Sequence, residues 1–515
     1  MPIQRGGIWG RAVVTALVVT VVAGSGIAGT AAAQSSGSAL PNTSIGGLGS
    51  TGSAGGQGSV GGGSLTDGTG SDGPGSLIDG TGSDGTASAG TTPITGSLGT
   101  ASYARSAFGS WIPGAVGSVV PAPDLAPPAL ETLRTGMLPS PIGDPFFDEY
   151  PAGLPGMANG QVIEVRDVTP MARTLPIGPV REVKQLKVKS TDATGAPSFA
   201  TATLIIPATA WPGPGPRPVL VNNVPINGLG RACTPSHTMA NGITPSTNFL
   251  EFLRPVTTKA EERGYAVLMP DHEGPRMAYG EPYEAGHAIL DTIRGVRNEF
   301  PAEFGTSKLA MMGYSGGAIA THGAVNLIDS YAPELRHDIV GAAFGGVPAD
   351  FEMLGRTMNG NLASGLFLAA VLGISRERTQ ILPLINSLGQ QLGMSSIKDM
   401  CVNNLAVMGI LNAPIEVLAN VKEALNSPVA HDIYAITKMA DLKSGTPLYI
   451  YNGGQDFWIP ALGARNLYDQ QCGKGVRAVY RQVPGEHLLG EAFGNPGAFD
   501  WVDARFRGEP APDEC

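Results

Sequence analysis

A serine flanked by glycines is the feature of this sequence whose residue types and spacing most clearly allow covalent chemistry. Gly313-Tyr314-Ser315-Gly316-Gly317 matches G-x-S-x-G, follows an apolar run and precedes small residues typical of a closely packed helix. A serine at such a strand–turn–helix junction projects from a sharp turn with its hydroxyl exposed. The helix N-terminus favours developing negative charge, and the Gly316 N–H is a candidate oxyanion donor. Ser315 is therefore the candidate nucleophile; the alternative is an ordinary turn in a glycine-rich chain.

A serine hydroxyl is a weak nucleophile until a base accepts its proton, so a histidine and a carboxylate are also required. His487 follows the last apolar run of the chain, where a loop can reach over the edge of a sheet. Asp456 lies on the turn after the preceding run, where a carboxylate can hold the imidazole in one tautomer and stabilise its charged form. The competitors are less favourably placed and are His431, Asp441, Asp469 and Glu486.

Eight apolar runs rich in β-branched residues predict a mostly parallel, eight-stranded sheet that positions these side chains. The first two runs are joined by a polar turn and are expected to pair as a hairpin. Helix-length segments separate the later runs, which is typical of an α/β fold with helices on both faces of the sheet. The expected strands are Val183–Asp192, Phe199–Pro207, Pro218–Val224, Tyr265–Asp271, Lys308–Tyr314, Ile339–Gly346, Pro447–Asn452 and Val476–Val483.

The interval from Pro348 to Thr446 is far longer than a crossover between strands requires. Its helical stretches are rich in apolar residues, so we expect a helical cap inserted at residues 348–446, over the carboxyl end of the sheet. An independent domain is less favoured because the sheet resumes afterwards. The expected helices are Asn248–Arg263, Tyr283–Glu299 and Gly316–Tyr331 outside the cap, and Leu362–Leu372, Thr379–Leu392 and Pro414–Leu425 within it.

The N-terminal part of the chain differs in composition from the rest. Residues 1–33 place Arg5 and Arg11 around the start of an apolar run that ends in small residues, which predicts a cleaved secretory signal peptide rather than a membrane anchor. Residues 34–143 are rich in Gly, Ser and Pro, and predict a disordered leader. Residues 144–515 have the apolar content of one large folded domain.

Charge and cysteine content narrow the classes of function. The net charge is −10 with no run of Lys or Arg, which argues against nucleic-acid binding and polybasic attachment to membranes. The four cysteines form no CxxC motif and no cluster with histidine, so we expect no metal and no other cofactor. An even number of cysteines in an exported chain indicates disulfides, for which three pairings are possible. The cysteines are Cys233, Cys401, Cys472 and Cys515.

These motifs together resemble the secretory lipase (LIP) family of lipase A type, in the α/β-hydrolase superfamily. The resemblance covers roughly residues 144–515. It is carried by Asp144-Pro145-Phe146-Phe147, Cys233-Thr234-Pro235-Ser236, Pro270-Asp271-His272-Glu273-Gly274-Pro275, Leu290-Asp291-Thr292-Ile293-Arg294, Gly313–Gly317, Gly454-Gln455-Asp456 with Pro460, and Gly485-Glu486-His487.

The resemblance implies an α/β-hydrolase with a helical lid and with Ser315, Asp456 and His487 as its catalytic triad. It further implies the disulfides Cys233–Cys401 and Cys472–Cys515. The resemblance also implies lipid or ester substrates, met at a lipid–water interface. From the signal-peptide pattern we expect the protein to be secreted, to the extracellular space or cell envelope, and no obligate protein partner is evident.

One position departs from the family pattern. The family commonly carries an Asp shortly before the Cys-x-Pro-Ser stretch, where this chain has Asn227. An amide can always donate a hydrogen bond, whereas a carboxyl donates only when protonated. We therefore expect Asn227 to be the second oxyanion donor beside Gly316, through its backbone N–H and with its side chain as a further donor. By turn chemistry alone, an asparagine in this loop fits a plain turn equally well.

Three functions remain open at this point. The first is a triacylglycerol lipase that works through an acyl-enzyme, and the apolar cap favours long acyl chains. The second is a short-chain carboxylesterase or an acyltransferase with the same catalytic residues. The third is a secreted, non-catalytic binding protein on a hydrolase scaffold, since a fold does not determine a function.

Overall fold

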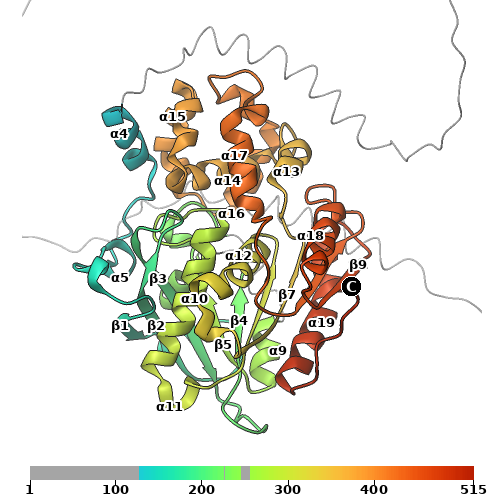
Figure 1. Ribbon diagram of the computed structural model, residues 1–515. Coiled ribbons are helices and arrows are strands. Elements are labelled where there is room, and N and C mark those ends of the chain that lie inside the picture. The colour runs from blue at the N-terminus through green and yellow to red at the C-terminus, as the bar shows by residue number, and fades with distance from the viewer. Residues whose placement is uncertain (1–126, 226, 245–246, 248–255) are drawn as a thin grey trace, which may run out of the picture. The chain divides into compact units, whose positions relative to one another are not determined.

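The computed structural model describes residues 127–515, except residue 226 and the segments 245–246 and 248–255 (Figure 1). The expected signal peptide, residues 1–33, and the expected leader up to residue 126 lie outside the described residues. No helix in the described part of the chain is both long and apolar enough to cross a membrane.

The described residues form one nine-stranded sheet in the order β1-β2-β3-β5-β4-β6-β7-β8-β9. All eight expected strands are present, and the first two pair as the expected antiparallel hairpin. Strands β4 to β9 run parallel to one another, whereas β1, β2 and β3 form an antiparallel edge. The strand that was not expected is β1; its side chains are only partly buried at the sheet edge, so it lacks the apolar pattern of the others. The strands are β1 Val162–Asp167, β2 Val180–Thr191, β3 Pro197–Pro207, β4 Val219–Asn223, β5 Ala266–Pro270, β6 Leu309–Tyr314, β7 Ile339–Gly345, β8 Leu448–Gly453 and β9 Ala478–Val483.

Helices cover both faces of the sheet, as expected for an α/β-hydrolase. Successive residues of a strand point to opposite faces, so Val219 and Val221 of β4 join one core while Leu220 joins the other. Helices α10, α12 and α18 pack on the first face, and α6, α7, α9 and α19 on the second. The helices of this layer and its loops are α5 Pro145–Asp148, α6 Thr169–Ala172, α7 Pro235–Asn241, α9 Val256–Glu262, α10 Pro282–Glu299, α11 Pro301–Phe304, α12 Gly316–Tyr331, α18 Ala461–Gly473 and α19 His487–Phe506.

A helical insertion, here called the cap, separates β7 from β8 and gathers at one end of the sheet (Figure 1). Its largest buried cluster contains apolar side chains from α13, α14 and α17, together with Ile319 of α12. The cap therefore packs against the first turn of the helix that follows Ser315. Its helices are α13 Phe351–Met358, α14 Ser364–Glu377, α15 Ser387–Met394, α16 Val402–Met408 and α17 Pro428–Lys438.

Two of the three helices expected in the cap differ from the structure. The stretch 379–392 is a 3₁₀ turn, Thr379–Leu384, followed by α15, because Asn386 caps the second helix by accepting from Gly389 N. The stretch 414–425 forms no α-helix. Its backbone pairs instead with the segment before α15: the Asn386 N–H donates to Leu418 O at 2.9 Å, and the Asn420 N–H to Leu384 O at 2.9 Å.

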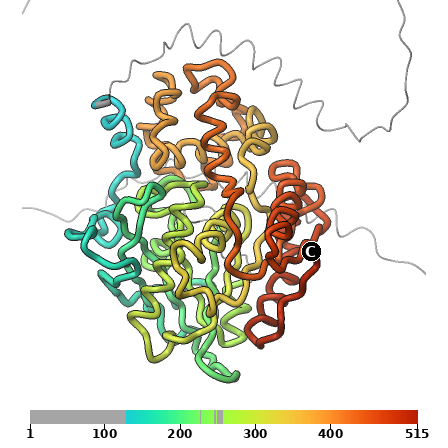
Figure 2. Tube along the Cα trace, in the orientation of Figure 1, coloured from blue at the N-terminus to red at the C-terminus, as the bar shows by residue number. Residues whose placement is uncertain are grey.

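The folded region begins before residue 144, inside the stretch expected to be a disordered leader. Helix α4, Pro127–Met137, buries Leu133 and Met137 in a cluster with Leu372 of α14. Figure 2 shows this first coloured segment beside the orange helices of the cap. The expected boundary at residue 143 is therefore too late by at least this helix, whose apolar residues are spaced for one-sided burial.

Candidate active site

Ser315 lies at the junction of β6 and α12, in a backbone conformation that few residues adopt. Its φ is 54° and its ψ is −119°, which turns the chain sharply out of the strand. The neighbouring glycines are required by space: a Cβ on Gly317 would lie 1.9 Å from Asn223 O, and one on Gly313 would lie 2.2 Å from Gly317 O. The motif thus lets α12 pack directly against β4 and β6 while Ser315 remains partly exposed.

His487 begins α19, just after β9, and its ring meets the serine. Its Nε2 lies 3.0 Å from Ser315 Oγ. The backbone of His487 is held as well, because the Tyr314 hydroxyl donates to its carbonyl at 2.5 Å. Gly346 leaves room for the ring, since a Cβ there would lie 2.9 Å from Cε1 of the imidazole.

Asp456 lies on the turn after β8 and completes the contact chain. Its Oδ2 is 2.6 Å from His487 Nδ1. The other oxygen, Oδ1, accepts from the backbone N–H of Trp458 at 3.1 Å and of Ile459 at 2.8 Å. The carboxylate is buried, and these contacts hold it in one orientation toward the ring. Neighbouring strand ends therefore bring together three side chains from distant parts of the sequence.

The competing residues occupy other positions. His431 is exposed on α17, and Asp441 and Asp469 are exposed as well. Glu486 caps α19 by accepting from the N–H groups of Leu488 and Leu489. Its role is therefore to satisfy the first turn of the helix that carries His487.

The oxyanion side of the site differs from the expectation at Asn227. Gly316 is the first residue of α12, so its N–H has no acceptor within the helix and remains a candidate donor. The Asn227 N–H, by contrast, donates to Glu273 Oε1 at 3.0 Å, so it is not directed at Ser315. The expectation that this N–H donates to an oxyanion is wrong, because the N–H donates instead to a buried carboxyl 46 residues away along the chain. Glu273 lies in a motif that carries the family resemblance, but its partner can be recognised only in three dimensions.

The loop that contains Asn227 is tied to the cap. The Val402 N–H donates to Asn227 O at 2.9 Å, and the Leu229 N–H donates to Met400 O at 2.8 Å. The disulfide Cys233–Cys401 joins the same two segments, and a second disulfide, Cys472–Cys515, joins α18 to the C-terminus. These are the pairs that the family resemblance implied.

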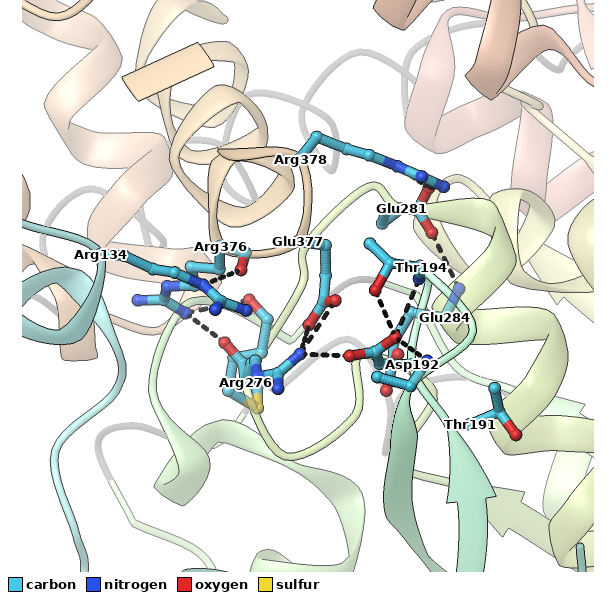
Figure 3. Close-up of polar contacts among 12 residues, drawn as sticks. Arg134, Thr191, Asp192, Thr194, Arg276, Glu281, Glu284, Arg376, Glu377 and Arg378 are labelled. Carbon is cyan, nitrogen blue, oxygen red and sulfur yellow. Dashed lines mark hydrogen bonds and ion pairs between the residues drawn. The ribbon is translucent and has the colours of Figure 1, made fainter. Parts of the chain in front are cut away.

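A cluster of buried charges also joins the cap to the sheet (Figure 3). Arg276, in the loop before α10, donates to Asp192 at 2.8 Å and to Glu377 at 3.0 Å. Arg378 donates to Glu281 at 2.8 Å. Burial raises the pKa of Glu377 to about 7, and the positive charge of Arg276 opposes that rise. The C-terminal end of α14 is therefore anchored to the sheet by ion pairs.

Exposed apolar side chains lie close to the histidine and the aspartate along the sequence. Phe457 is 59% exposed and Phe493 is 56% exposed, and Leu488 and Leu489 directly follow His487. On the cap, exposed apolar residues include Leu362, Ile410 and Leu411. Large exposed apolar side chains near a site are typical of surfaces that contact lipids or apolar ligands.

Within the described ranges, no group of three or more His, Cys, Asp or Glu side chains is arranged to hold a metal ion.

Comparison with known proteins assigns the family. The model of the family described as secretory lipase matches residues 254–514. Lipase A of Moesziomyces aphidis is 32% identical over 403 residues, which is 75% of this chain and 84% of that protein. The chain belongs to the secretory lipase family. A second relative, named as a probable inactive lipase of Mycobacterium tuberculosis, is 28% identical and covers 78% of this chain and 90% of its own length.

A solved structure of a similar protein supports the fold. Candida antarctica lipase A in its closed state matches with a TM-score of 0.65 and 29% identity, over 74% of this chain and 89% of that one. This match confirms the α/β-hydrolase fold with its mostly parallel sheet. Because one relative is named as inactive, membership of the secretory lipase family does not by itself establish catalysis.

Proposed function

We propose that this protein is a secreted serine ester hydrolase that cleaves acylglycerols through Ser315, His487 and Asp456. The observation that carries the proposal is the continuous contact chain from Ser315 Oγ to His487 Nε2 at 3.0 Å and from His487 Nδ1 to Asp456 at 2.6 Å. Both distances are within the reach of proton transfer along hydrogen bonds. Secretion is supported by the secretory family and by two disulfides, which persist in oxidising compartments.

The hydrogen bonds among the three residues indicate how each proton moves during the reaction. Ser315 Oγ attacks the ester carbonyl while its proton passes to His487 Nε2, and Asp456 stabilises the resulting imidazolium. The Gly316 N–H and the N-terminus of α12 stabilise the negative charge that develops on the carbonyl oxygen. His487 then protonates the departing alcohol, which leaves an acyl group on Ser315. A water molecule, deprotonated by His487, attacks this acyl-enzyme and releases the carboxylic acid.

A lipid substrate is the preferred class because of the apolar surroundings of the site. Phe457 and Leu488 are exposed and directly follow Asp456 and His487 in the sequence. The cap presents further exposed apolar side chains. Burial of acyl methylene groups contributes roughly 0.8 kcal/mol each, so a long chain gains more from such a surface than an acetyl group does. A short-chain carboxylesterase or an acyltransferase with an alcohol acceptor is the second candidate, because the same three residues serve both reactions.

The test is hydrolysis of p-nitrophenyl esters from acetyl to palmitoyl by the parent protein and by matched variants. His487→Ala and Ser315→Ala are expected to lower kcat by about 10⁴-fold. His431→Ala is the control, because this histidine is exposed on α17 and should leave kcat unchanged. Full activity of Ser315→Ala, or loss of activity only in His431→Ala, would refute the proposal. Faster turnover of acetyl than of octanoyl and longer esters would favour the short-chain esterase.

A further inference from the structure

Glu273 is a buried carboxyl whose contacts are directed at the loop after β4, where the family pattern places the second oxyanion donor. This loop, residues 224–225 and 227–230, is here called the oxyanion loop. Glu273 lies between β5 and α10 and is 3% exposed. Its Oε1 accepts the Asn227 N–H at 3.0 Å, and the Gly228 N–H also bonds to this carboxyl. Its neighbour His272 contacts Val224 O through Nε2 at 2.8 Å. His272 and Glu273, two successive residues, thus both bond to the oxyanion loop.

The opposite side of the oxyanion loop is held by the cap. Leu229 and Asn227 pair with Met400 and Val402 through the two backbone hydrogen bonds already described. Gly228 is so close to this segment that a Cβ would lie 2.6 Å from the Cα of Cys401. The loop therefore lies between the cap and Glu273, and the loss of the Glu273 contacts would free it on one side.

Glu273 also shares a small cavity with the first turn of α12. The lining of this cavity includes Glu273, Gly316, Ile319 and Ala320. The second carboxyl oxygen, Oε2, is buried and has no hydrogen-bond partner among the described residues. Glu273 thus borders the same space as Gly316, the proposed oxyanion donor.

The surroundings of Glu273 favour its neutral form. Burial raises its pKa to about 8, and the hydrogen bonds from Asn227 and Gly228 oppose this rise. Arg376 of α14 lowers the pKa through its charge, and Asp271 raises it. The first turn of α12 contributes only uncharged residues to the shared cavity. The titratable groups beside it on its own loop are Asp271, His272, Tyr279 and Glu281.

We propose that Glu273 is a positioning residue that holds the oxyanion loop as a neutral carboxylic acid, and that its ionisation slows turnover. This inference rests on the proposed function. The neutral acid accepts the two loop N–H groups without placing a net charge at the cavity that Gly316 borders. A carboxylate there repels the negative charge that develops on the substrate oxygen, in a buried site where such repulsion is poorly screened.

The test compares the pH dependence of kcat and KM in the parent protein, Glu273→Gln and Glu273→Leu from pH 6 to pH 9.5, with the uncatalysed rate subtracted. The parent should lose kcat as the pH rises through about 8, with KM little changed. Glu273→Gln keeps the acceptor and cannot ionise, so kcat should stay high across this range. Glu273→Leu removes the acceptor, so kcat should fall by about 10- to 100-fold at every pH, as expected for a small displacement of catalytic groups.

Glu261→Gln is the matched control, because Glu261 is another buried carboxyl with a raised pKa, located on α9 where it accepts from Gly178. This variant should keep the alkaline fall in kcat. The proposal is overturned if Glu273→Gln keeps that fall, or if it is as impaired as Glu273→Leu at pH 6. Should Glu273→Leu fail to fold, the profile of Glu273→Gln still decides. Failure of the proposed function would appear differently, as Ser315→Ala matching the parent.

Discussion

Replacing Arg376 with methionine is expected to destabilise the fold more than any change at a surface arginine. Arg376 lies on α14, is 1% exposed and donates to five backbone carbonyls. The acceptors belong to the end of α4, the oxyanion loop, the loop before α10 and the cap: Met137 O at 3.0 Å, Leu229 O at 2.8 Å, Arg276 O at 2.9 Å, Met277 O at 2.9 Å and Lys398 O at 2.8 Å.

The magnitude follows from these contacts. A hydrogen bond from a charged donor contributes about 1.5–3 kcal/mol, and the cost of burying the guanidinium offsets several kcal/mol of the sum. Methionine fills much of the volume but leaves all five carbonyls without this donor. We therefore expect the free energy of unfolding to fall by about 3–5 kcal/mol, a large part of the 5–15 kcal/mol that is typical of a domain.

The assay is urea unfolding at neutral pH with the disulfides intact, followed by circular dichroism and tryptophan fluorescence. Arg134→Met is the control, because Arg134 makes one bond to Arg376 O at 3.2 Å and a 3.8 Å ion pair with the exposed Glu131. Arg134→Met should lower the free energy of unfolding by less than about 1 kcal/mol. A loss of less than about 1 kcal/mol in Arg376→Met would refute the view that one guanidinium joins these four segments.

Two further predictions concern the disulfides and a buried carboxyl. The Cys233–Cys401 bridge closes 168 residues and the Cys472–Cys515 bridge closes 43, so removing the first by paired serine substitutions should cost about 1 kcal/mol more. It should also lower kcat more, because it borders the oxyanion loop; equal effects on stability and activity would contradict this. Burial raises the pKa of Glu261 to about 7, above its unfolded value, so the stability from its neutral form is complete at low pH and is lost as the pH rises toward 7. The unfolding free energy of the parent should fall relative to that of Glu261→Gln by about 1.4 kcal/mol per pH unit in this range, and parallel curves would show that Glu261 titrates normally.

Local patterns were enough to predict the strands, the hairpin and the candidates for the proton chain. Buried parallel strands require continuous apolar runs, so β4 to β8 can be recognised without knowledge of their neighbours. Ser315 stands out because the turn itself demands the surrounding glycines, and His487 and Asp456 stand out because they follow strand ends. Their order along the chain indicated that they could meet, but the 3.0 Å and 2.6 Å contacts depend on the packing of α12 and α19 around the sheet.

Contacts between distant segments could not be predicted from such local patterns. Residues 414–425 have the composition of a helix, yet their backbone pairs with Leu384 and Asn386, because hydrogen bonds across the cap outweigh a small helix propensity. Helix α4 appeared to belong to a disordered leader because its partners in the cap lie more than 200 residues later in the chain. The partner of the Asn227 N–H was mistaken for the same reason: nothing near Asn227 in sequence reveals that Glu273 takes it. The amino-acid sequence therefore determines short-range periodicity and turn chemistry directly. The burial of a polar group, and with it the group's partner and charge, depends on which remote segments the fold packs around it.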